Sequence, residues 1–162
     1  MSSPHERRRH PRVPIRVPAT LVPSADGPVE LWQLSQEGMF LRMARSPSVL
    51  DGLKVVAQLK EGRLEAVVQV RSFLPRGSFA QFPDVSGAGC QITQMSSESR
   101  RVVMAYLQRM RDVYSKLQFQ MAIGKPPEAA LVKEAGLDLL TEPAQVKEAV
   151  QRIVRAFNEK KS

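Results

Sequence analysis

Between positions 14 and 95, hydrophobic residues alternate with polar ones in short runs, a pattern typical of β-strands. In the first run, Ile15, Val17, Ala19 and Leu21 share one face of an extended chain. Five more apolar runs follow between clusters of Gly, Pro, Asp and Ser, at 29–35, 38–43, 53–60, 64–74 and 88–95. Because no helical pattern interrupts the six runs, we expect an antiparallel sheet that closes into a small barrel and hides its edges.

After residue 96 the spacing of the apolar residues becomes that of an α-helix. Ser96 or Ser97 is suited to cap its start, with Glu98 in the first turn. Apolar side chains then recur at steps of three and four residues: Val103, Leu107, Met110, Tyr114, Leu117 and Met121. Gly124 and the pair of prolines that follows it end this helix. We interpret four basic residues along it as a solvent-exposed face: Arg100, Arg101, Arg109 and Arg111.

Two shorter helical patterns follow, at about 127–135 and from about 141–143 onward. The second places five apolar residues on one face: Val146, Val150, Ile153, Val154 and Phe157. Such helices need a surface to cover, which is either the barrel or another protein. The distal half of the long helix, with Leu117 and Met121, packs either on these helices or on a second subunit. The pattern therefore leaves a homodimer through the C-terminal helices open.

These patterns predict a mainly β fold with C-terminal helices, in three parts. A flexible basic arm covers residues 1–13, a six-stranded antiparallel barrel with its long amphipathic helix covers 14–123, and a helical extension covers 124–162. A chain of 162 residues, 43% of them hydrophobic, is long enough to bury one real core.

Composition argues against several classes of protein. No apolar run approaches the ~20 residues of a membrane span, and the N-terminus lacks the hydrophobic region of a secretory signal. The single cysteine, Cys90, fits a reducing cytoplasm and is expected to be a buried structural thiol. His5 and His10 both lie in the arm, and no catalytic triad, carboxylate pair or Gly-Lys phosphate motif exists. We therefore expect no metal, no cofactor and no enzymatic activity.

The charge points to an anionic partner. The formal net charge is +8, and residues 1–16 carry five arginines against one acidic residue, Glu6. Arg8 and Arg12 stand four residues apart in this arm, with Arg9 between them. A guanidinium grips a phosphate bidentately and stacks flat on a base, so the pair suits a small dianionic ligand. The alternative, from charge alone, is a disordered basic tail that binds polyanions loosely.

A second polar group lies at the end of the predicted strand 29–35. Gln33 and Ser35 are two residues apart, so they should point to the same face and address the edge of a base. Gly38 permits a tight turn and a close approach of the backbone. Trp32 should point to the opposite face and pack in the core or at the barrel end, with stacking on a base as the alternative.

The two motifs, in this order on this strand pattern, resemble those of the PilZ family. That family has a six-stranded barrel with a C-terminal helix and binds bacterial cyclic di-GMP. Arg8 and Arg12 match its R-x-x-x-R motif, and Ser35 and Gly38 match the later positions of [D/N]-x-S-x-x-G. The resemblance covers about residues 5–118. It departs at Gln33, where the family has the Asp or Asn that is implied to hydrogen-bond a guanine edge.

The resemblance implies a cytoplasmic cyclic di-GMP receptor. The implied ligand-binding residues are Arg8, Arg9, Arg12, Gln33, Ser35 and Gly38. The ligand would draw the arm across the barrel and present a new surface to a protein partner of a motility or surface-polysaccharide system. The departure at Gln33 favours a second hypothesis, a degenerate adaptor that binds no nucleotide and acts only through protein contacts. A third, nucleic-acid binding, is disfavoured because the few aromatic residues fall at core-like positions.

Overall fold

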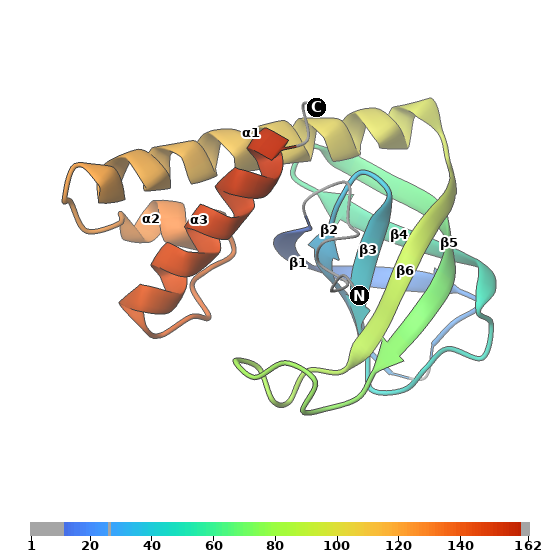
Figure 1. The fold of residues 1–162 in the computed structure, drawn as a ribbon. Coiled ribbons are helices and arrows are strands. Elements are labelled where there is room, and N and C mark those ends of the chain that lie inside the picture. The colour runs from blue at the N-terminus through green and yellow to red at the C-terminus, as the bar shows by residue number, and fades with distance from the viewer. Residues whose placement is uncertain (1–11, 26, 160–162) are drawn as a thin grey trace.

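A computed structural model describes residues 12–25 and 27–159, and in these residues six antiparallel strands close into a barrel that precedes three helices (Figure 1). The strands are β1 (Val13–Val22), β2 (Val29–Leu34), β3 (Gly38–Arg42), β4 (Asp51–Leu59), β5 (Gly62–Leu74) and β6 (Gly87–Met95). Around the barrel they follow the order β1-β2-β3-β6-β5-β4. The predicted fold is confirmed.

The apolar face of each strand fills the barrel. Leu31, Leu41, Val55 and Leu64 are completely buried there, and so is Cys90, as predicted. Interdigitating side chains leave no room for a ligand inside a barrel of this size. Any binding site must therefore lie on the outside of the barrel wall.

Helix α1 (Ser97–Ala122) covers one end of the barrel and continues well past it (Figure 1). The Ser96 hydroxyl caps it by accepting a hydrogen bond from the Ser99 backbone N–H at 3.1 Å. None of the helices in the described chain is long and apolar enough to cross a membrane.

The extension folds back beneath the overhanging half of α1. It contains α2 (Ala129–Glu134) and α3 (Pro143–Glu159), and the apolar face of α3 joins the same core as the barrel. Tyr114, which is fully buried on α1, donates a hydrogen bond to the Ala135 carbonyl at 2.7 Å. The distal half of α1 therefore packs on the chain's own extension.

Two of the helix arginines are not the solvent-exposed face that the sequence suggested. Arg109 pairs with Glu61 at 2.5 Å and with Glu134 at 3.0 Å, so it joins the β4–β5 turn, α1 and α2. Arg111 donates to the Phe157 carbonyl at 3.0 Å and lies 5.3 Å from the centre of its ring. Helical periodicity could not reveal these contacts, because it does not show where the extension returns.

The extension also holds the start of β1. Gly136, with φ +75°, lies so close to Pro14 that an added Cβ would come within 2.8 Å of the Pro14 Cβ. Tyr106 of α1 donates to the Pro14 carbonyl at 2.5 Å, and Arg16 forms an ion pair with Asp138. The strand that follows the basic arm is thus fixed by α1 and by the α2–α3 connection.

Packing of the extension on α1 can be tested by two substitutions on the distal half of that helix. Leu117 is fully buried, whereas Phe119 is 65% exposed. Leu117→Ala should lower the free energy of unfolding by about 2–5 kcal/mol, because it leaves a cavity in the core. Phe119→Ala should change it by less than about 0.5 kcal/mol. Urea denaturation measures both, and equal effects of the two substitutions would contradict this packing.

Candidate functional site

A cavity of about 750 Å³ lies on the outside of the barrel, between the barrel wall and the extension. Four parts of the fold surround it: the part of the barrel wall that carries Arg12, Gln33 and Gly89; the β5–β6 loop at residues 75–86; the α2–α3 connection; and helix α3. Its size is that of cavities that bind small molecules and cofactors. Polar and aromatic side chains both line it, so it can hold a planar, charged ligand.

Arg12, which immediately precedes β1, lies against bare backbone on the barrel wall. A Cβ atom added to Gly38 would come within 3.2 Å of Arg12 Nη2, and one added to Gly89 within 4.0 Å of Nη1. These glycines lie on the neighbouring strands β3 and β6. Their lack of side chains lets the guanidinium lie close to the sheet and still line the cavity.

Burial changes the electrostatics of this part of the wall. Loss of hydration lowers the pKa of Arg12, while Cys90 and the Glu37 carboxylate act in the opposite direction. Burial has the opposite effect on an acid and raises the pKa of the Cys90 thiol to about 12. The thiol is therefore neutral at physiological pH and is no nucleophile. A guanidinium that has lost part of its water shell gains more from an anionic ligand than a fully solvated one does.

Ser35 and Gly38 close the turn between β2 and β3. The Ser35 hydroxyl donates to the Gly38 carbonyl and accepts from the Gly38 N–H, both at 3.1 Å, and the Ser35 N–H donates to the same carbonyl at 2.9 Å. Ser35 is only 2% exposed and is not among the residues that line the cavity. The serine and glycine of this motif therefore shape the turn that holds Gly38 beneath Arg12.

Gln33 and Trp32 both line the cavity, contrary to the expectation that Trp32 points to the opposite face, although Trp32 is buried in a small hydrophobic cluster as expected. The cause is a β-bulge. Leu31 pairs with Leu41 and Gln33 pairs with Phe40, so Trp32 is an extra residue on β2. Both side chains consequently leave the barrel wall on the outer face, while Leu31 and Leu34 fill the interior. Strict alternation, on which the expectation rested, fails at a bulge.

Trp32 anchors a small aromatic cluster under the β5–β6 loop. Its ring centre lies 5.9 Å from that of Phe40, 5.6 Å from Phe79 and 5.3 Å from Phe82. The tilted and edge-on contacts are the arrangement that aromatic pairs prefer. Trp32 Nε1 is buried and has no hydrogen-bond partner within the described chain. The loop is thereby packed against the strand that carries Gln33.

The structure brings together only part of the predicted site. Arg12 and Gln33 line one cavity, with Ser35 and Gly38 in the turn beside it. Arg8 and Arg9 lie outside the described residues. Sequence reasoning missed Ser72 on β5, the aromatic cluster and α3, which also line the cavity. The Gly-x-Gly sequence at 87–89 could have indicated that another group lies close to the backbone of β6. No local sequence pattern indicates that α3 lines the cavity.

Comparison with known proteins identifies the barrel. The family model described as PilZ domain matches residues 6–109. The structure is similar to the Bacillus subtilis inhibitor of motility MotI/DgrA, with a TM-score of 0.50 and 15% identity over 65% of this chain and 52% of that chain. It is also similar to the PilZ domain of YcgR from Escherichia coli, described with cyclic di-GMP, with a TM-score of 0.47 and 15% identity over 68% and 98% of the two chains.

A further similar structure is the complex of K. pneumonia MrkH with cyclic di-GMP, with a TM-score of 0.45 and 14% identity over 63% of this chain and 51% of that chain. The chain thus spans about half the length of MotI/DgrA and of MrkH. Comparison with curated protein sequences gives no significant match.

The close contact at Gly38 predicts that even a methyl group there is costly. In Gly38→Ala the new Cβ would lie 2.8 Å from the Cys90 carbonyl oxygen, which is backbone, and 3.2 Å from Arg12 Nη2. We expect the free energy of unfolding to fall by about 1–3 kcal/mol, since β3 and β6 must separate slightly. Gln36→Ala in the same turn is the control and should be near neutral. Denaturation showing Gly38→Ala as stable as the wild type would contradict the tight packing.

Proposed function

The chain belongs to the PilZ domain family, and we propose that it is a receptor for cyclic di-GMP that signals through contact with another protein. The observation that carries the proposal is the position of Arg12. Its guanidinium lies against Gly38 and Gly89 and faces a cavity that Gln33 also lines. A cyclic dinucleotide carries two phosphates for guanidinium groups and two bases whose edges bind amides.

The shape and chemistry of the cavity support a nucleotide of this size. Its volume of about 750 Å³ lies in the usual range for small-molecule sites. Arg12 supplies a cation, Ser72 a hydroxyl and Gln33 an amide, while the aromatic cluster offers apolar surface to a base. No group of His, Cys, Asp and Glu that could hold a metal ion occurs in the described chain.

The arm supplies the switch in this proposal. Arg8 and Arg9 lie upstream of Arg12 in the sequence, and their like charges repel one another until a dianion neutralises them. Binding would gather the arm over the cavity and create a new surface, which a protein partner in the cytoplasm recognises. Control of motility or of a surface polysaccharide is the output that we propose for such a receptor.

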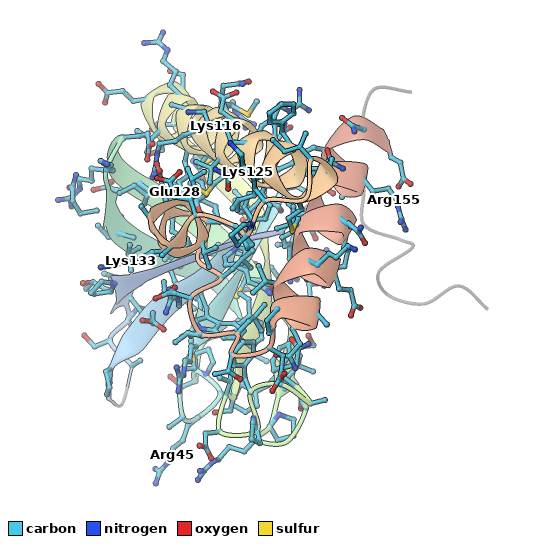
Figure 2. The ribbon with its side chains drawn as sticks, turned by 90° about the vertical axis from the view of Figure 1, so that its left-hand side faces the viewer. Arg45, Lys116, Lys125, Glu128, Lys133 and Arg155 are labelled. Carbon is cyan, nitrogen blue, oxygen red and sulfur yellow. The ribbon has the colours of Figure 1, made fainter. Side chains whose placement is uncertain are left out.

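Removal of the Arg12 guanidinium tests the proposal. Isothermal titration should show that the wild type binds cyclic di-GMP and that Arg12→Ala binds at least about 10- to 100-fold more weakly, because a charge-assisted contact to a phosphate is lost. Arg45→Ala is a matched control, since Arg45, which is labelled in Figure 2, lies in the β3–β4 connection and does not line the cavity. Absence of binding heat for the wild type would refute the receptor function.

A second candidate function is favoured by Gln33, which stands where the family has Asp or Asn. A chain that has lost nucleotide binding would act as an adaptor through protein contacts alone. Gln33→Asp separates the two. For a receptor, the substitution should change an existing affinity by no more than about 100-fold. Binding by Gln33→Asp together with none by the wild type would establish the adaptor.

A further inference from the structure

The wall of the cavity that faces the barrel is formed by the extension. Gln145, Glu148 and Arg152 of α3 all line the cavity, and all lie beyond the residues that match the PilZ domain model. Glu148 and Arg152 are four residues apart, so they lie one above the other on the same face of the helix. The α2–α3 connection and the Arg111 contact with Phe157 hold this helix in place.

Glu148 and Arg152 are both exposed. Burial raises the pKa of the Tyr114 hydroxyl, and the charge of Arg152 acts on that pKa in the opposite direction. Within the described chain, neither Glu148 nor Arg152 forms an ion pair or a side-chain hydrogen bond, although their spacing would allow an ion pair between them. Among the described residues that line the cavity, Glu148 is the only acidic one. Glu148 is exposed, so its carboxylate is free to accept hydrogen bonds from donors of a ligand in the cavity.

We propose that α3 is the guanine-reading wall of the site, an inference that rests on the proposed binding of cyclic di-GMP. The Glu148 carboxylate accepts hydrogen bonds from N1–H and N2–H₂ of a guanine, and the Arg152 guanidinium donates to O6 and N7 of the same base. Carboxylate and guanidinium are each bidentate, so one base is held at both edges.

This assignment also explains how the site tolerates Gln33. Gln33 carries the same amide as the Asn of the family motif but holds it one methylene farther from the backbone, whereas the two oxygens of a carboxylate match the two donors of guanine's Watson–Crick edge. With Gln33 on the barrel wall and Glu148 on α3, the carboxylate function lies on the opposite side of the same cavity. Base recognition in this chain would then depend on the extension and not on the barrel motif alone.

Substitution of Glu148 gives a result that distinguishes recognition from mere proximity. If Glu148 reads guanine, Glu148→Gln should weaken cyclic di-GMP binding at least about tenfold, because a charge-assisted pair of hydrogen bonds is lost. If Glu148 only borders the cavity, loss of its negative charge should leave the affinity for the dianion unchanged or raise it. Glu142→Gln, on the same extension but outside the cavity lining, is the charge-matched control.

Arg152→Ala should likewise weaken binding about tenfold or more. Arg155→Ala should not, since Arg155 projects from the outer side of α3 and does not line the cavity (Figure 2). Cyclic di-AMP provides a second readout, because adenine lacks N1–H, N2–H₂ and O6. The wild type should prefer cyclic di-GMP, and Glu148→Gln should reduce that preference.

The outcomes separate the two levels of the proposal. Wild-type binding that is insensitive to Glu148→Gln and to Arg152→Ala would overturn the role of α3 and leave the receptor function intact. A wild type that binds no cyclic di-GMP would overturn both. Circular dichroism of each variant checks that α3 is still folded, so that a loss of affinity reports on the side chain.

Discussion

The site depends on the contact between one arginine and two positions that lack side chains. Arg12 lies against Gly38 on β3 and Gly89 on β6; a Cβ added to Gly38 would come within 3.2 Å of the guanidinium, and one added to Gly89 would lie in contact with it at 4.0 Å. The Ser35–Gly38 turn sets the start of β3, and the pairing of Phe40 with Gly89 sets the register of β6. A cation is thereby placed at a fixed position on a wall that is otherwise sheet backbone. Partial loss of its hydration, which lowers its pKa, favours pairing with an anion.

The extension contacts β1 and also forms the part of the site opposite the barrel wall. Gly136 and Tyr106 both contact Pro14, two residues after Arg12, and Asp138 pairs with Arg16. The same extension continues into α3, which forms the opposite wall of the cavity. One segment thus contacts the strand that follows Arg12 and also forms the wall of the cavity opposite it. Residues 124–159 therefore connect the start of β1 with the opposite wall of the cavity.

Much of the fold was predictable from the sequence, because each strand and helix carries its own periodicity. The bulge at Trp32 was not, since an extra residue in a strand depends on its pairing with β3. The aromatic cluster and the α3 wall depend on contacts between segments distant in sequence, which no local pattern records. For the same reason Arg109 and Arg111 looked like an exposed face but contact Glu61, Glu134 and Phe157. Of the residues in the two family motifs, Arg12 and Gln33 line the cavity. The sequence could not show that Ser35 turns inward to Gly38.

A crystal structure of the full chain with cyclic di-GMP would test this account most directly. We predict nucleotide density in the cavity, with a phosphate at Arg12 and a guanine between Gln33 and the face of α3 that carries Glu148 and Arg152. Nucleotide bound elsewhere on the barrel, with the cavity empty and α3 unchanged, would contradict it.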